Sequence, residues 1–167
     1  ISNPKAYREW FIEQMEVTFL KRREIVAKKR NVEIEEVKLF DVRTPLQMAI
    51  QILKRHRDIM FSGKENKPIS IIITTLAAKA YTGQTDLYDT IETILQNMHK
   101  YIEKDSSGKI LICNPTVSSE NFADKWEESP EKERAFFDWV RSAQTDILQN
   151  PMEFAGGFGS MKNQLRE

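Results

Sequence analysis

The sequence predicts a mainly α-helical protein, because apolar residues recur at helical spacing along most of its 167 residues and helix start signals precede them. Strand signals are confined to one short apolar run, ILIC at residues 110–113, which is too short to form a sheet by itself. Apolar residues make up 40% of the chain and charged residues 30%, a balance that argues against disorder. We therefore expect a helical bundle with at most a short β segment.

The first predicted helix is a long amphipathic one that runs from Pro4 to about Arg30. Proline suits the first position of a helix, and apolar residues then follow at helical spacing. A basic run, KRREIVAKKR at residues 21–30, forms its far end, and the acidic EIEE at residues 33–36 comes directly after it. We expect these charges to form a solvated, salt-bridged surface, which is favoured over a nucleic-acid patch.

Two further helices are predicted, from Thr44 to Phe61 and from Ile69 to Tyr81. The hydroxyl of Thr44 can cap free backbone N–H groups, and Pro45 fits the first helical position because its missing N–H group costs no hydrogen bond there. The second of these helices opens with Ser70, and its body is so apolar that burial on all sides is expected.

The rest of the chain again favours helices. We expect a helix capped by Asp86 that ends near Glu103, a short one over residues 120–127, and one over residues 129–150 that starts at Ser-Pro and is stopped or kinked by Asn-Pro. Residues 151–167 contain three glycines and are expected to form a flexible tail. The domain prediction is one helical domain over residues 1–167.

Composition excludes several classes of protein. The 25 basic and 25 acidic residues cancel, so affinity for a polyanion would have to come from a local patch. The single cysteine, Cys113, excludes an internal disulfide framework, and His56 with His99 provides no zinc-ligand spacing. Since no apolar run reaches about 18 residues and no signal-peptide layout is present, we expect no membrane span and a cytoplasmic location.

No catalytic motif is predicted within the chain. GGFG at residues 156–159 lacks the spacing and the preceding strand of a dinucleotide-binding loop. Nothing in the spacing brings Cys113 and His99 together as nucleophile and base, and a short apolar strand most often buries an inert cysteine. The carboxylates at 33–36 and at 127–128 sit in surface-like charge runs, so we predict no metal site.

Candidate binding residues gather where the two central helices meet. Lys54, Arg57 and Asp58 share a face of the first helix, and Ser70 opens the second across a short loop. A phosphate near Ser70 would meet a hydroxyl, backbone N–H groups and the positive end of a helix. Lysine is a compact point charge that suits a triphosphate. For Arg57 and Asp58, an ion pair with only a structural role is the alternative.

Four separated blocks of the sequence resemble one known family. The blocks are SNPKAYREWF at 2–11, TPLQMAIQILKRHRD at 44–58, KPISIIITTLAAKAYTG at 67–83 and NPTVSSENFADKW at 114–126. Together they resemble the C-terminal helical domain of bacterial CD-NTases, the cyclic-oligonucleotide synthases of CBASS anti-phage defence and relatives of cyclic GMP-AMP synthase and oligoadenylate synthetase. The resemblance covers almost the whole chain in the family's order.

The resemblance implies that the chain is the helical half of a Polβ-like nucleotidyltransferase and begins just after the catalytic core. In that family the Gly-Ser motif, the D-x-D pair and a third acidic residue bind two Mg²⁺ ions, and all of them lie in the N-terminal core. We therefore expect this chain alone to be catalytically inactive and to hold no cofactor, whereas the parent enzyme would need Mg²⁺. The parent would join nucleoside triphosphates into a cyclic oligonucleotide and release pyrophosphate.

The resemblance also implies roles for individual residues. Lys54 in LKRHRD and Ser70 in PIS correspond to the family's contacts with the donor nucleoside triphosphate. Arg57, Asp58 and Tyr81 are possible cleft or supporting residues, and core packing is the alternative for Tyr81. The implied partners are nucleoside triphosphates and the N-terminal catalytic domain, with no role expected for a membrane or for nucleic acid.

Two other functions stay open at this point. One is a non-enzymatic helical scaffold or protein-interaction module, in which Lys54 and Ser70 have structural roles only. The other is an RNA-binding helical domain that uses the basic run at residues 21–30.

The block ENFADKW, with Asn121, Asp124 and Trp126, is expected to brace the domain or to line the cleft.

Overall fold

The structure, a computed structural model, describes residues 3–38 and 41–150, and within these it is mainly α-helical as predicted. Its α-helices are α1 (Pro4–Gln14), α2 (Glu16–Arg30), α3 (Pro45–Met60), α4 (Ser70–Ala80), α5 (Leu87–Asn97) and α6 (Pro130–Ala143). Its strands are β1 (Glu103–Lys104), β2 (Ile110–Leu111), β3 (Cys113–Asn114) and β4 (Val117–Asn121). Single helical turns are η1 (Ile34–Glu36), η3 (Met98–Tyr101), η4 (Asp124–Trp126) and η5 (Gln144–Gln149, a π-helix).

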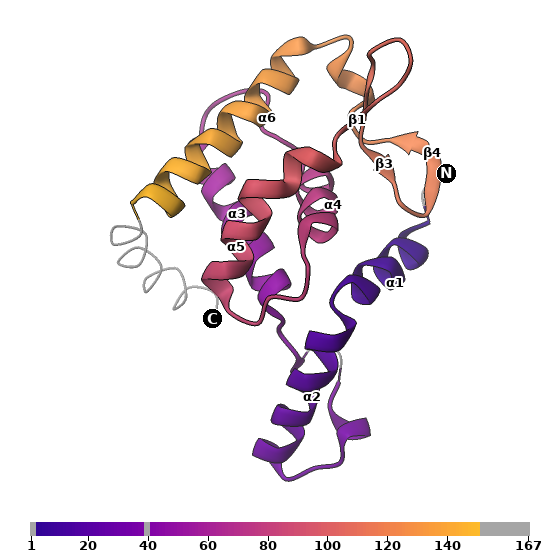
Figure 1. Cartoon of the computed structure of the whole chain (residues 1–167), viewed down its shortest axis with the longest axis vertical. Helices are drawn as coiled ribbons and strands as arrows, with labels where there is room; N and C mark the ends of the chain where they lie inside the picture. Colours follow the sequence, from indigo (N-terminus) through magenta and orange to yellow (C-terminus); the bar gives the residue numbers. More distant parts are fainter. Residues whose placement is uncertain (1–2, 39–40, 151–167) are drawn as a thin grey trace.

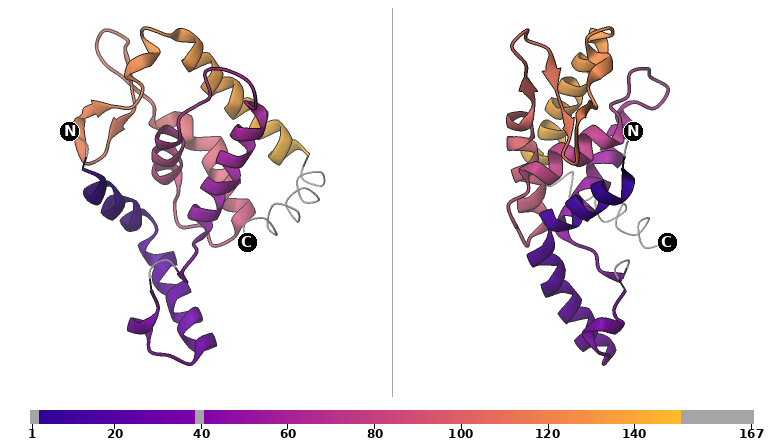
Figure 2. Two further views of the ribbon diagram at one scale, coloured as in Figure 1. Left: turned by 180° about the vertical axis from the view of Figure 1, so that it is seen from behind. Right: turned by 90° about the vertical axis from the view of Figure 1, so that its right-hand side faces the viewer.

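The molecule has a body and an arm (Figure 1). Helices α3, α4, α5 and α6 form the body, and the strands lie at its end beside α1. The arm is α2 with η1, and it projects away from the body in all three ribbon views (Figure 2). The arm has a small hydrophobic cluster of its own, whereas one large cluster fills the body.

Helices α3 and α4 form where the sequence predicts them. Thr44 makes a capping box with Gln47: the Gln47 N–H donates to the Thr44 hydroxyl and the Thr44 N–H donates to the Gln47 side chain, at 3.3 and 2.9 Å. Seven of the eleven residues of α4 are buried, as its apolar body predicted. Packing of α4 against α3 and α5 makes it the centre of the body.

The prediction of one long helix from Pro4 to Arg30 is wrong, because the chain breaks at Met15 into α1 and α2. Met15 leaves helical geometry and is only 2% exposed, and its sulfur accepts a hydrogen bond from the Thr44 hydroxyl at 3.0 Å. The break lets α1 lie against α4 while α2 leaves the body. Neither glycine nor proline stands at the break, so no local signal in the sequence predicts it.

The predictions between Asp86 and Glu127 are only partly confirmed. Asp86 does cap α5, accepting from the Asp89 N–H at 3.0 Å, but α5 ends at Asn97, earlier than expected. The ILIC run supplies β2 and part of β3, which pair antiparallel with β1 and β4. The short helix predicted over residues 120–127 is wrong, since this stretch contains the end of β4 and the single turn η4.

Helix α6 starts after Ser129 with Pro130, as predicted, and continues into η5, which ends at Gln149 and is followed by Asn150 as its C-cap. The expected core residues of this segment are buried: Phe136, Trp139, Val140, Ala143 and Ile147. The predicted glycine tail at 151–167 lies outside the described residues. In the described part of the chain, no helix is long and apolar enough to cross a membrane.

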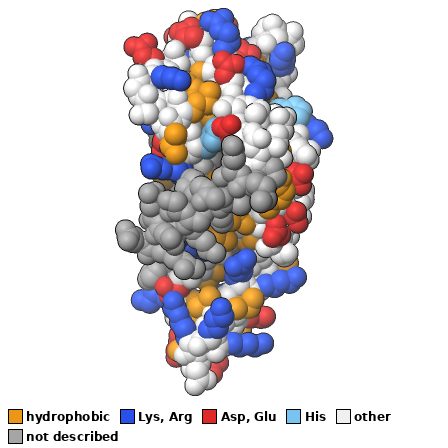
Figure 3. Space-filling view, turned by 90° about the vertical axis from the view of Figure 1, so that its left-hand side faces the viewer, with side chains coloured by type: hydrophobic (Ala, Val, Ile, Leu, Met, Phe, Trp, Pro, Cys, Tyr) orange, Lys and Arg blue, Asp and Glu red, His pale blue; other side chains and the backbone are white. Residues whose placement is uncertain are grey.

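The basic residues of the arm are partly tied down. Arg30 forms an ion pair with Asp41 at 3.0 Å, and Arg23 donates to the backbone carbonyls of Val37 and Glu35. The salt-bridged arrangement expected here thus uses Asp41 and backbone oxygens, and no ion pair between described residues involves the carboxylates of 33–36. Figure 3 shows basic side chains around apolar ones at the α2 end of one face.

Candidate functional site

A cavity of about 420 Å³ lies where α1, α3, α4 and the segment before α3 meet. Its lining mixes apolar side chains with hydrogen-bonding and cationic ones, as in a small-molecule site. The lining residues are Phe11, Val42, Arg43, Gln47, Met48, Ile50, Gln51, Lys54 and Thr74.

Lys54 is the predicted site residue that this cavity contains. Gln47, Gln51 and Lys54 are spaced four and three residues apart, so they follow one another along a single face of α3. Lys54 is half-buried, and Thr74 reaches the same cavity from α4. An ammonium, a hydroxyl and two amides therefore line the same cavity, and this combination can bind the phosphates and a polar edge of a nucleotide.

Ser70 lies in a different environment from the one expected. It is the first residue of α4, and its hydroxyl accepts a hydrogen bond from the Arg57 guanidinium at 2.9 Å. The N-cap is Ile69, which offers no side-chain cap. Ser70 is exposed and stands four residues before Thr74, so it faces the same side of α4 as the cavity, although it is not one of the residues that line it.

Arg57 holds the loop between α3 and α4 in place. Its side chain is buried, and it donates to the Pro68 carbonyl at 3.0 Å, to Ser70 and to the Asp58 carboxylate at 2.8 and 3.0 Å. The Asp58 carboxylate also pairs with Lys67 at 3.4 Å. Arg57 and Asp58 thus make the ion pair that the sequence offered as their structural alternative.

The charges around Asp58 keep it ionised. Partial desolvation works to raise the pKa of this carboxyl, but hydrogen bonds and positive charge from Arg57 and Lys67 outweigh it, and the pKa lies below its ordinary value. Burial of the Arg57 guanidinium without a counter-charge would be costly, and the ionised Asp58 provides that counter-charge. This network fixes the start of α4, and with it the direction of the helix that carries Thr74.

Tyr81 caps the end of α4 and is only 6% exposed. Its hydroxyl donates to the Gln84 carbonyl at 2.7 Å and shares a hydrogen bond with Thr18 at 2.9 Å. Tyr81 therefore joins the body to the arm by packing and hydrogen bonding.

A second tyrosine fixes α1 in the same way. The Tyr7 hydroxyl shares a hydrogen bond with Thr75 of α4 at 2.8 Å. Burial raises the pKa of Tyr7, and the bond to Thr75 opposes the rise. This contact helps to hold α1, and so Phe11, against the cavity.

Reasoning from the sequence missed most of the residues that line the cavity with Lys54. Gln51 carried a usable signal, since it precedes Lys54 by three residues on the same helical face. Phe11 and Thr74 come from other helices, and only their packing brings them to Lys54. Within the described ranges, no group of three or more His, Cys, Asp or Glu residues is placed to hold a metal ion.

The block ENFADKW does brace the domain. The Asn121 side chain accepts from the Ile112 and Ala123 N–H groups at 2.9 and 3.0 Å and donates to the Ile110 carbonyl at 3.0 Å. It thereby links β2, β3 and the turn that leads to η4. Trp126 is 7% exposed and packs against Phe136 of α6.

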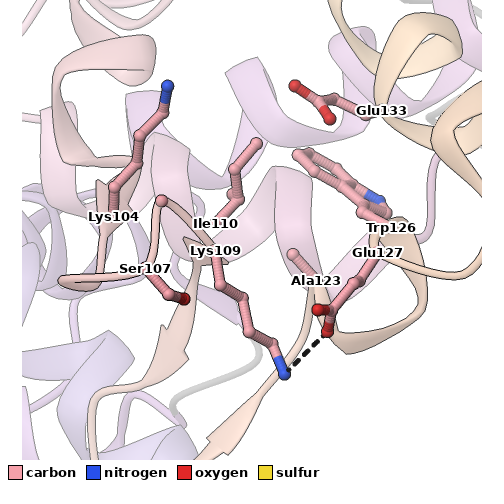
Figure 4. A pocket seen from close by; sticks show the side chains of 9 residues that line it. Lys104, Ser107, Lys109, Ile110, Ala123, Trp126, Glu127 and Glu133 are labelled. Atoms are coloured by element: carbon pink, nitrogen blue, oxygen red, sulfur yellow. Dashed lines mark ion pairs between the residues drawn. The ribbon is translucent and has the colours of Figure 1, made fainter.

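Trp126 also lines a cavity of about 320 Å³ beside the loop between β1 and β2 (Figure 4). Lys104 and Lys109 approach it from the hairpin, and Glu127 and Glu133 face them from the other side. Lys109 and Glu127 form an ion pair at 3.3 Å. The lysine and glutamate charges of this cavity balance.

No protein-family model matches the chain, but it is similar to known proteins in sequence and in fold. It is 36% identical over 150 residues to a c-di-GMP synthase of Roseivirga ehrenbergii, an alignment that covers 87% of this chain and 38% of that protein. Its fold matches the Bradyrhizobium diazoefficiens CD-NTase CdnG, solved in complex with GTP, with a TM-score of 0.62 and 20% identity over 92% of this chain and 48% of that one.

The structural comparison shows that the chain has the fold of one region of a CD-NTase. Its sequence is similar to that of a c-di-GMP synthase and its fold to that of a CD-NTase, so both comparisons support a relationship to the CD-NTase family. The chain spans less than half of the length of the two relatives that it matches.

Proposed function

We propose that the chain is the donor-nucleotide-clamping helical domain of a nucleotidyltransferase that makes cyclic oligonucleotide signals from nucleoside triphosphates in anti-phage defence. The family supports the chemistry, since one relative is named a c-di-GMP synthase and another is a CD-NTase in complex with GTP. The catalytic carboxylates and the Mg²⁺ ions would belong to the other part of the parent protein, which is N-terminal by the resemblance of the sequence to the family.

The cavity around Lys54 is the observation that carries this proposal. Its volume of about 420 Å³ falls within the range of ligand sites, and its lining includes a lysine and two amides from α3 and a threonine hydroxyl from α4. The Lys54 ammonium would neutralise phosphate charge, and Thr74 would donate a hydrogen bond beside it. Clamping of the phosphates by this half would hold the donor nucleotide for attack.

Ser70 would contribute to this site from its edge, outside the residues that line the cavity. Because Arg57 donates to its hydroxyl, the Ser70 oxygen is held in place with its own proton free to turn toward a ligand. The Arg57 and Asp58 network would position this edge of the site, and Tyr81 would support the opposite end of α4.

A titration of the 167-residue chain with GTP, followed by ¹H–¹⁵N spectra, tests the proposal. We expect GTP to shift amide signals of residues 47–54 and 70–74. Lys54→Ala should weaken GTP binding about tenfold, because one charge-assisted contact to phosphate is lost. Lys64→Ala, which removes the same charge from the exposed loop after α3, should leave the affinity unchanged.

The melting temperature of each variant separates binding from folding. Lys54→Ala should have the same melting temperature as the wild type. A large fall in the melting temperature would instead indicate that Lys54 takes part in a structural ion pair. If GTP shifts no signal around the cavity, or binds Lys54→Ala as tightly as the wild type, the assignment of this cavity is wrong. The alternative of a scaffold or protein-interaction module would then be favoured.

A further inference from the structure

A separate cavity of about 210 Å³ lies between the loop before α4, the turn η4 and the first turn of α6. Three lysines line it, each from a different one of these segments: Lys67, Lys125 and Lys132. A single carboxylate, Asp124, accompanies them. Its lining therefore has an excess of positive charge, in contrast to the balanced cavity of Figure 4.

The lysine charges are weakly compensated. Among the ion pairs of the described residues none includes Lys125 or Lys132, and the single one of Lys67, with Asp58, is 3.4 Å long. The Lys67 side chain is 51% exposed, so little holds it against that partner. An anion in the cavity could recruit all three ammonium groups without breaking a buried ion pair.

The other walls are apolar. Trp126 and Phe122 come from the segment that contains η4, and Ile72 comes from α4. Apolar walls lower the local dielectric constant, so a charge–charge interaction here is stronger than one in open solvent. Lysines around such a cavity also repel one another, and a bound anion would relieve this repulsion.

The cavity is distinct from the one around Lys54. Ile72 of α4 lines the smaller cavity together with Ile69, the N-cap residue of that helix, whereas Thr74 lines the larger cavity from about the opposite side of α4. No residue lines both cavities. Ligand binding in the smaller cavity would therefore be independent of the function proposed for the Lys54 cavity.

We propose that this second cavity, called the lysine cavity from here on, binds a small phosphate-bearing anion through Lys67, Lys125 and Lys132. Lysine is a compact point charge suited to phosphate oxygens. About 210 Å³ is half of the volume of the Lys54 cavity, so the lysine cavity suits pyrophosphate or the phosphate tail of a nucleotide with its base outside. The phosphate group is the recognised chemistry in either case.

Titration of the 167-residue chain with inorganic pyrophosphate, GTP and guanosine tests this assignment. We expect pyrophosphate to shift the Trp126 indole N–H signal and the amide signals of residues 66–69 and 122–126. Guanosine should leave these signals in place, since it lacks phosphate. A shift of the same signals with GTP would show that the cavity accepts the phosphate tail of a nucleotide. If GTP leaves the signals in place while pyrophosphate shifts them, the ligand is free pyrophosphate.

Paired lysine variants make the test specific. Lys125→Ala with Lys132→Ala should weaken pyrophosphate binding at least tenfold, whereas Lys104→Ala with Lys109→Ala, on the other side of Trp126, should change it less than twofold. Binding should also weaken as salt rises. Lys54→Ala should leave pyrophosphate binding intact even where it abolishes GTP shifts at the Lys54 cavity.

Three outcomes would overturn the assignment. The first is no shift of these signals with pyrophosphate up to about 10 mM, where even weak specific binding would register. The second is a shift of equal size in the Lys125 and Lys132 double variant, provided that its spectrum shows a folded chain. The third is an equal shift with guanosine, which would make the cavity an apolar site.

Discussion

Helices α4 and α2 are similar in length but opposite in character. Seven of the eleven residues of α4 are buried, whereas only three of the fifteen residues of α2 are. Five of the nine large apolar side chains that are exposed in the described residues belong to the arm: Val17, Leu20, Ile25, Val32 and Ile34. The body therefore depends on hydrophobic burial, and the arm depends on a small cluster of four buried residues and on its attachment to the body.

The difference explains where the candidate site lies. The Lys54 cavity is walled by α3 and α4, which are fixed by the core and by the Arg57 network, so its side chains are held in position. The arm offers charge and apolar surface but no such support. A region with few buried apolar contacts is expected to open locally more often than the rest of the molecule.

The largest expected effect is a cavity in the body. Leu76→Ala in α4 removes a side chain that is 0% exposed and should lower the free energy of unfolding by about 2–5 kcal/mol. Leu20→Ala in α2 removes the same atoms from a residue that is 49% exposed and should change it by less than about 0.5 kcal/mol. Urea denaturation of both variants measures the contrast, and equal losses would contradict the distinction between body and arm.

An intermediate effect is expected from the network that holds the start of α4. Arg57→Ala leaves the buried Pro68 carbonyl without its Arg57 donor and leaves Asp58 with Lys67 as its ion-pair partner, and should cost about 1–3 kcal/mol of unfolding free energy. Arg55→Ala, on the exposed side of the same helix, serves as its control and should be nearly neutral. Thermal unfolding provides the measurement, and a neutral Arg57→Ala would show that the network does not stabilise the loop.

The smallest effect concerns the link between the two regions. Tyr81→Phe removes the hydroxyl that bonds to Thr18 and to the Gln84 carbonyl, and should cost about 0.5–1.5 kcal/mol. Amide hydrogen exchange should rise in α2 more than in α3 or α5, because the arm loses a contact with the body. Tyr101→Phe, at an exposed tyrosine, is the matched control. Uniform exchange across the chain in Tyr81→Phe would mean that this bond does not couple the arm to the body.

Local signals predicted the central helices well. Thr44 and Pro45 stand together at the start of α3, and the apolar body of α4 is unbroken, so propensity and burial favour the same structure. Lys54 could also be identified as a candidate, because its charge lies across a short loop from Ser70, the residue that opens the next helix. These features depend on residues close in sequence.

Other features were beyond local reasoning. The break at Met15 follows from burial of that residue against Thr44, and the strands around 103–121 are stabilised by pairing with one another. The segment over residues 120–127 contains no glycine or proline that would exclude the predicted helix. Pairing of β4 with β3 prevents that helix.

By itself, the sequence determined that the chain is mainly helical, where α3, α4 and α6 begin, and that Lys54 and Ser70 stand on facing helices. Only the tertiary structure decided that Ser70 is bonded to Arg57, that Lys54 shares a cavity with Phe11 and Thr74, and that three lysines from separate segments surround another. The physical reason is the separation along the chain over which each kind of interaction acts. Caps and apolar periodicity act within one or two helical turns, whereas cavities and buried ion pairs form between segments that meet only when the core packs.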